Sequence, residues 1–71
     1  MAIEAEEKAE DLAKLESEVS YIYWHMGQLD RALEFQLKAV AIMQQLFPNG
    51  HPNLDVMKLN LAIIKMQQKR I

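Results

Sequence analysis

The chain has no cysteine, only two glycines and two prolines, and a single tryptophan in 71 residues. The lack of cysteine excludes a disulfide, and two separated histidines without cysteine do not make a structural zinc site. A chain this short forms one domain and buries only about 60% of the surface that it exposes when unfolded. We therefore expect close helix packing or self-association to stabilise the fold.

Long apolar runs and a strong excess of one charge are also missing. No stretch of about 20 apolar residues occurs, so the sequence predicts no membrane span. Residues 1–7 are acidic and lack the basic segment of a secretory signal peptide. A net charge of −2 gives no electrostatic footprint for nucleic acid. We therefore expect a cytoplasmic protein with no membrane or nucleic-acid partner.

The charges that are present are segregated along the chain. Residues 1–18 have a net charge of −5, and residues 53–71 have a net charge of +3. Acidic residues near a helix start and basic residues near a helix end both suit the helix dipole. The alternative interpretation is that the two ends pair, either within one chain or between two chains.

The composition is rich in Ala, Leu, Glu, Lys, Gln and Met, and it predicts an all-α fold of three helices. The first is expected over residues 2–26 and ends at Gly27. The second is expected from residue 28 or 29 to residue 46, before Pro48-Asn49-Gly50, and the third over residues 52–69. The short link at Gly27 predicts an antiparallel hairpin of the first two helices.

Apolar residues at spacings of three and four mark the faces of these helices. The stripe of the first helix consists of Ala5, Leu12, Leu15, Val19, Ile22 and Met26. The main stripe of the second consists of Leu29, Ala32, Leu33, Leu37, Val40 and Met43. The third helix has two nearly opposite stripes, which are Leu54, Met57, Leu61 and Ile64 on one side and Val56, Leu59, Ile63 and Met66 on the other. Docking on a hairpin buries only one of these two, so we expect the second to meet solvent, a ligand or another chain.

A shift of 42 residues aligns the third helix with the first, and a period of this size is typical of helical-hairpin solenoids. It matches Leu15 with Met57, Val19 with Leu61, Ser20 with Ala62, and Ile22 with Ile64. The turn segment reads Tyr23-Trp24-His25-Met26-Gly27-Gln28-Leu29-Asp30-Arg31-Ala32-Leu33. Later segments read Ala39-Val40-Ala41-Ile42, Phe47-Pro48-Asn49-Gly50-His51-Pro52 and Asn60-Leu61-Ala62.

These segments resemble the tetratricopeptide repeat (TPR) family, in particular the 42-residue repeat of kinesin light chains. Gln36 departs from the family pattern, which usually has an aromatic residue at that position. The resemblance implies about one and a half repeats in a single helical domain of residues 1–71. Residues 1–12 would be a frayed or projecting extension, 13–47 a complete repeat hairpin, and 52–70 the first helix of a second repeat.

The resemblance also implies a non-catalytic protein–protein interaction module that binds a peptide or helix in a concave groove. The groove residues that it implies are Lys14, Ser17, Tyr21 and Trp24 on the first helix, and Val56, Leu59, Asn60, Ile63, Met66 and Gln67 on the third. The alternative is a structural unit that forms a homodimer through the second apolar stripe of the third helix.

Nothing in the sequence predicts catalysis, a cofactor or a metal. His25 and His51 have no carboxylate or cysteine at ligand spacing, so we expect neither a metal site nor acid–base chemistry. We interpret His51 as a linker residue before Pro52, and His25 as facing the helix dipole or solvent. No paired carboxylates, nucleophile–base pair or glycine-rich phosphate loop indicates an enzyme.

Overall fold

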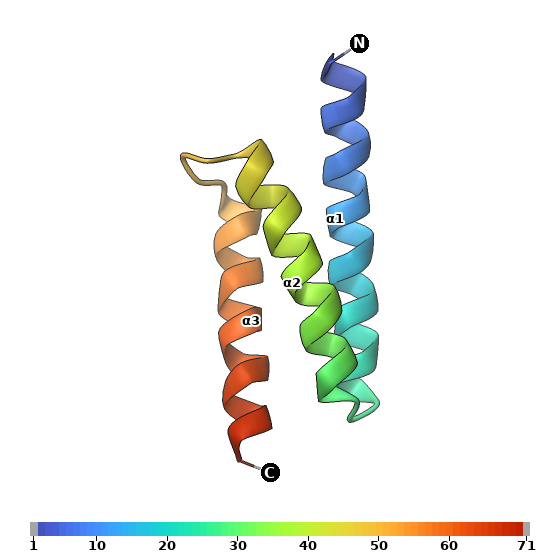
Figure 1. The fold of residues 1–71 in the computed structure, drawn as a ribbon, viewed down its shortest axis with the longest axis vertical. Helices are drawn as coiled ribbons and strands as arrows, with labels where there is room; N and C mark the ends of the chain where they lie inside the picture. The colour runs from blue at the N-terminus through green and yellow to red at the C-terminus, as the bar shows by residue number, and fades with distance from the viewer. Residues whose placement is uncertain (1, 71) are drawn as a thin grey trace.

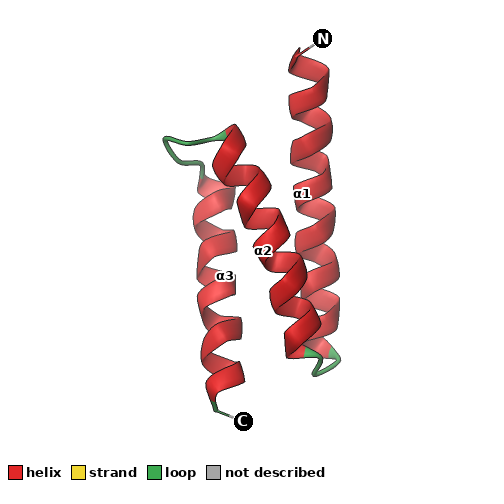
Figure 2. Ribbon diagram, viewed as in Figure 1, coloured by secondary structure: helices red, strands yellow, loops and turns green. Residues whose placement is uncertain are grey.

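Three α-helices make up the computed structural model, which describes residues 2–70. They are α1 (Ala2–His25), α2 (Leu29–Leu46) and α3 (Pro52–Lys69), and they agree with the predicted helices to within one residue. The helices alternate in direction, with α2 between α1 and α3, and the chain ends lie at opposite ends of a body of 45 × 21 × 14 Å (Figure 1). The described residues contain no strand (Figure 2), which confirms the predicted all-α, three-helix fold. None of these helices is long and apolar enough to cross a bilayer.

A glycine in the left-handed conformation ends α1. Gly27 has φ +79°, which an L side chain rarely adopts. Its N–H donates to the Trp24 carbonyl at 3.0 Å, and the N–H of Gln28 donates to the Tyr23 carbonyl at 2.9 Å. This is a Schellman motif, which satisfies carbonyls left free at the helix end. It reverses the chain within a few residues, so α2 returns antiparallel along α1.

Four small residues are buried at the contact between α1 and α2. Ala13 and Ser20 of α1 and Ala32 and Ala39 of α2 are at most 1% exposed. They are seven residues apart on each helix, so each pair lies on one face. The hydroxyl of Ser20 donates to the Ala32 carbonyl at 2.6 Å, and Ala13 packs with Ala39 in the core. Small side chains at these positions let the two helix backbones approach closely.

The apolar stripe predicted for the first helix does not form this contact. Leu12, Leu15, Ile22 and Met26 are 49–60% exposed, and Val19 is half-buried. Successive residues are about 100° apart around a helix, so turning Ala13 and Ser20 toward α2 carries this stripe to another side. We call Leu12, Leu15, Val19, Ile22 and Met26 the α1 stripe.

The third helix buries one of its two predicted stripes. Leu54, Met57 and Ile64 are at most 6% exposed, and Leu54 and Met57 pack in one core cluster with Ala39 and Met43 of α2. On the opposite side, Val56, Leu59 and Met66 are 57–60% exposed and Ile63 is half-buried. We call these four residues the outward α3 stripe. No other part of residues 2–70 covers it, as the two-stripe pattern predicts.

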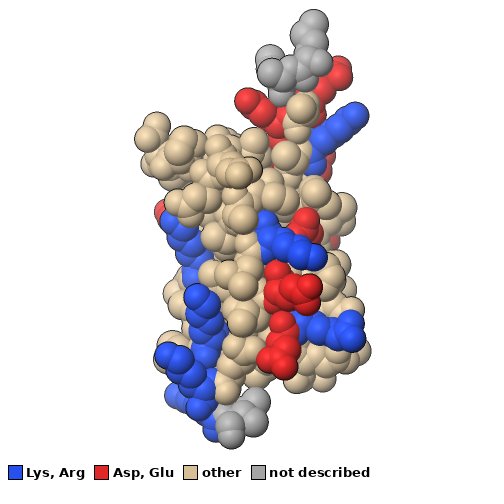
Figure 3. Space-filling view, viewed as in Figure 1, with Lys and Arg blue, Asp and Glu red and all other residues tan. Residues whose placement is uncertain are grey.

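Opposite charges gather at opposite ends of the molecule. Lys and Arg side chains form a column over α3, while acidic side chains surround the start of α1 (Figure 3). Because these two ends lie far apart, the predicted pairing within one chain is wrong for the described residues (Figure 1). The ion pairs that form instead are Glu10–Lys14 at 3.7 Å and Glu34–Lys38 at 3.9 Å, each within one helix.

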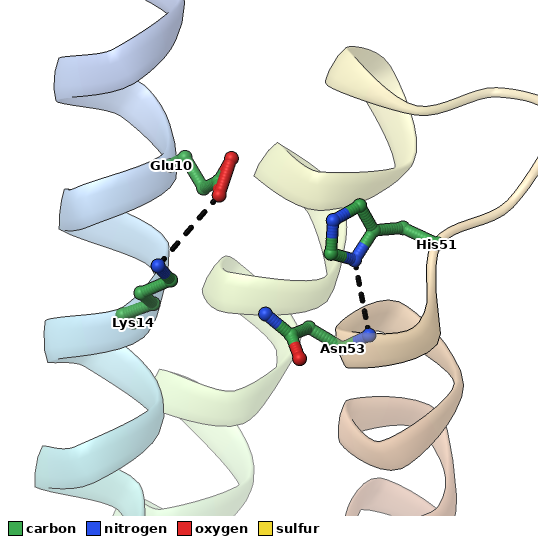
Figure 4. A network of polar contacts seen from close by, with 4 residues as sticks. All are labelled: Glu10, Lys14, His51 and Asn53. Atoms are coloured by element: carbon green, nitrogen blue, oxygen red, sulfur yellow. Dashed lines mark hydrogen bonds and ion pairs between the residues drawn. The ribbon is translucent and has the colours of Figure 1, made fainter.

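His51 caps α3 rather than serving only as a linker. Its backbone is extended, with φ −159° and ψ 140°, and its Nδ1 accepts the N–H of Asn53 at 3.0 Å (Figure 4). The imidazole also packs against the Phe47 ring, with centroids 4.4 Å apart. Pro52 fills the first helical position, where a missing N–H costs nothing. The cap and the proline together start α3 at this residue.

We expect His51→Ala to lower the free energy of unfolding by about 1 kcal/mol, because the substitution removes the cap acceptor. His51→Asn is the control, since asparagine accepts the same hydrogen bond and should retain most of the stability. Urea unfolding followed by circular dichroism measures both. Equal losses in the two variants would contradict a capping role and assign the effect to ring packing on Phe47.

Candidate functional groove

A groove of about 510 Å³ runs between α1 and α3. Both helices supply its walls, and α2 contributes one residue, Gln36, to its floor. The lining residues are Lys14, Ser17, Glu18, Ser20, Tyr21, Ile22 and Trp24 of α1, Gln36 of α2, and Asn53, Val56, Met57, Asn60 and Ile64 of α3. A hollow of this size is in the range of sites that bind small molecules or short peptide segments.

Polar and aromatic side chains form the α1 wall. Lys14, Ser17, Tyr21 and Trp24 follow one another at spacings of three and four, so they lie along one side of the helix. The Tyr21 ring is edge-on to Trp24, with centroids 6.3 Å apart, and to His25, with centroids 4.3 Å apart. Trp24 and His25 thus hold the Tyr21 ring in place. Tyr21 is 56% exposed, so much of its surface is accessible to a ligand.

Two amides and a valine form the α3 wall. Asn53, Val56 and Asn60 line the groove and lie above the buried side chains of Met57 and Ile64. The Asn53 side chain points from the start of α3 toward α1 (Figure 4). The wall therefore offers hydrogen-bond donors and acceptors beside an apolar floor.

Gln36 joins the floor to both walls. It is 1% exposed, its Nε2 donates to the Met57 carbonyl at 3.0 Å, and its Oε1 accepts the hydroxyl of Ser17 at 3.2 Å. A buried amide must find such partners to offset its desolvation. The sequence showed that Gln36 departs from the TPR pattern, which usually has an aromatic residue at this position. Its role in bridging the two walls was not predicted. One α2 side chain thereby fixes the separation of α1 and α3.

Hydrogen bonds close the end of the groove nearest Gly27. The indole Nε1 of Trp24 donates to Gln67 Oε1 at 2.6 Å, which ties the last turn of α1 to the last turns of α3. Next to it, Gln68 Nε2 donates to Asp30 Oδ1 at 2.7 Å at the start of α2. All three helices are therefore fastened together at this end.

The other end of the groove is open and carries a cation. Lys14 and Asn53 line it from opposite walls (Figure 4). The Lys14 ammonium pairs with Glu10 at 3.7 Å, and its side chain is 49% exposed. An exposed pair of this kind contributes little to stability, so Lys14 is free to turn toward a ligand.

The structure brings together six of the ten groove residues implied by the sequence. Lys14, Ser17, Tyr21, Trp24, Val56 and Asn60 all line the groove. Leu59, Ile63 and Met66 lie on the outward α3 stripe and do not line it. Gln67 is held by Trp24. The predicted site thus divides into two surfaces, a polar and aromatic groove and an apolar outer stripe.

Both histidines already have local roles in the fold. His25 packs edge-on against Tyr21, and His51 caps α3. Within residues 2–70, no group of three or more His, Cys, Asp or Glu side chains is placed to hold a metal ion. The arrangement around the groove is suited to binding through hydrogen bonds and aromatic contacts.

No protein-family model matches the chain, and the searches of curated proteins and of solved structures give no significant match.

Proposed function

We propose that this protein is a non-catalytic interaction module of the TPR type that binds a peptide segment of a partner protein in the groove between α1 and α3. The observation that carries the proposal is the groove itself. It combines an aromatic wall at Tyr21 and Trp24 with an amide wall at Asn53 and Asn60 over a buried apolar floor. Peptide-binding surfaces use amides for the main chain and apolar or aromatic contacts for side chains.

The spacing of the two asparagines favours an extended ligand over a helical one. Asn53 and Asn60 are seven residues apart, which corresponds to a rise of about 10.5 Å along α3. Three residues of an extended chain span about 10 Å. Both amides can therefore bond to the backbone of one extended segment, at positions three residues apart.

The aromatic wall supplies the anchors for side chains of such a segment. Tyr21 is exposed along the groove, and Trp24 is held in place by Gln67. Rigid aromatic residues dominate the binding energy of many interfaces because they bury a large area at a small entropic cost. Lys14 at the open end favours a ligand with an acidic group there.

The TPR assignment is supported by the helix order and by the motif positions. Gly27 ends the first helix, and the segment from Phe47 to Pro52 links the second helix to the third, as the resemblance implies. The groove lies between α1 and α3, and the resemblance makes these the first helices of two successive repeats, between which the family binds its ligands.

A second candidate function is self-association through the outward α3 stripe. Its residues Val56, Leu59 and Met66 remain more than half exposed, and burying each large apolar side chain is worth about 1.5–3 kcal/mol. This surface is distinct from most of the groove, so the two functions are separable by mutation.

Selection of a phage-displayed library of random 12-residue peptides on the immobilised protein tests the groove. We expect selected peptides to bind with micromolar Kd, and Asn60→Ala to weaken them about tenfold through the loss of two hydrogen bonds. Asn49→Ala is the matched control, because Asn49 is exposed in the loop away from the groove. Equal affinity of both variants for every selected peptide would contradict the proposal, and strictly helical ligands would overturn the extended mode.

A further inference from the structure

The α1 stripe is the exposed equivalent of the face that α3 buries. A shift of 42 residues matches Leu12 with Leu54, Leu15 with Met57, and Ile22 with Ile64. The α1 members are 49–58% exposed, whereas their α3 equivalents are at most 6% exposed. This pattern of side chains is therefore buried on α3, whereas the equivalent pattern on α1 is exposed.

The outward α3 stripe is the complementary unpaired surface. Its Leu59 and Met66 are equivalent, by the same shift, to Ser17 and Trp24, which line the groove on α1. One chain thus leaves one apolar face uncovered on α1 and a different one uncovered on α3. Each exposes large side chains at helical spacing.

The charges beside the two stripes are opposite in sign on balance. At about 100° per residue, Glu4, Asp11 and Glu18 lie beside the α1 stripe and outnumber Lys8, which lies in line with it. The same geometry places the basic side chains Lys58, Lys65 and Lys69 on one flank of the outward α3 stripe, beyond Asp55. Figure 3 shows basic side chains in a column over α3. Complementary borders of this kind select the partner and orientation of two apolar faces.

We propose that the α1 stripe of one copy binds the outward α3 stripe of a second copy, with the two helices antiparallel. In this orientation the acidic first half of α1 meets the basic last turns of α3, with Asp11 near Lys69 of the second copy. A parallel orientation would place the same carboxylates near Asp55 at the start of α3. The charge pattern therefore selects the antiparallel arrangement.

The proposed contact is heterologous, because it joins two different surfaces. Each bound copy still has one free α1 stripe or one free α3 stripe, so assembly continues head to tail without closing. The inference refines the self-association candidate and does not rest on peptide binding. A failure here leaves the groove proposal untouched, provided that it is tested at stripe residues outside the groove, such as Leu15 and Leu59.

Mixing two monomeric variants tests the heterologous contact by sedimentation equilibrium. We expect the mass of the unmodified protein to rise with concentration beyond that of a dimer. Leu15→Glu disables the α1 stripe and Leu59→Glu disables the outward α3 stripe, and neither residue lines the groove, so each variant alone is expected to be monomeric. Their equimolar mixture restores one intact contact and should form a 1:1 heterodimer. Both positions are more than half exposed, so the fold is expected to survive, which circular dichroism checks.

Three outcomes would overturn the proposal. The unmodified protein could remain monomeric at several hundred micromolar, Leu15→Glu could remain a dimer through α3–α3 pairing, or the mixture of variants could fail to associate. The orientation is tested separately in the heterodimer. Asp11→Lys on the Leu59→Glu chain should weaken it a few-fold, and Lys69→Glu on the Leu15→Glu chain should restore it. If the second change weakens the heterodimer further, the antiparallel arrangement is wrong.

Discussion

Ile64→Ala is expected to lower the free energy of unfolding by about 2–5 kcal/mol. Ile64 is fully buried on the face of α3 that packs on the hairpin, so truncation removes apolar burial and leaves a cavity. Small domains are stable by only about 5–15 kcal/mol in total, so this single change removes a large part of the stability. Urea unfolding measured by circular dichroism gives the difference.

Ile22→Ala is the matched control for this substitution. It makes the same chemical change at the equivalent position of α1, where the side chain is 58% exposed. We expect a loss of less than about 0.5 kcal/mol at a concentration where the protein is monomeric. Similar losses at the two positions would show that α1 buries its stripe within one chain and would contradict the described helix orientation.

Ala39→Leu is expected to destabilise the α1–α2 hairpin by about 1–3 kcal/mol or more. Ala39 is fully buried against α1 and packs with Ala13, so three additional carbon atoms have no space without separating the helices. Because Gln36 bridges both groove walls from α2, a shift of α2 also widens the groove. Thermal unfolding and peptide affinity should therefore change together.

Ala41→Leu serves as the control for overpacking, since Ala41 is exposed on the same helix. Helix propensities of alanine and leucine are similar, so we expect little change in stability. If Ala39→Leu left the stability unchanged, the small residues would not set the distance between α1 and α2.

Helix boundaries were predictable because the residues that set them act locally. Gly27 and Gly50 permit a positive φ, Pro48 and Pro52 fix φ and lack an N–H, and the helices begin and end beside these residues. The burial of Leu54, Met57 and Ile64 was also predictable, because α3 carries a well-defined apolar stripe.

The orientation of α1 was not predictable from its large apolar residues. Hydrophobic periodicity marks the α1 stripe, but the hairpin forms through Ala13 and Ser20, which contribute little to that signal. Their seven-residue spacing, matched by Ala32 and Ala39, was the available clue. Close approach of two helices favours small residues over hydrophobic ones, and a count of apolar positions does not detect it.

The groove was predictable only in part, because some of its features depend on helix register and others on how the helices pack. Six residues implied by the repeat pattern line it, because their positions depend only on helix register. The separation of Leu59 and Met66 from the groove depends on how far α3 rotates as it docks. The role of Gln36 depends on partners from two other helices, Ser17 and the Met57 carbonyl, which no local pattern contains.

The central claim is that the groove between α1 and α3 binds an extended peptide, and NMR titration of the labelled protein with a selected peptide tests it most directly. Trp24 is the single tryptophan, so its indole N–H gives one resolved reporter inside the groove. We expect saturable shifts of this signal and of the Tyr21, Val56 and Asn60 signals, all with the same Kd. Shifts confined to the outward α3 stripe or the outer face of α2, with the Trp24 indole unmoved at saturation, would contradict the claim.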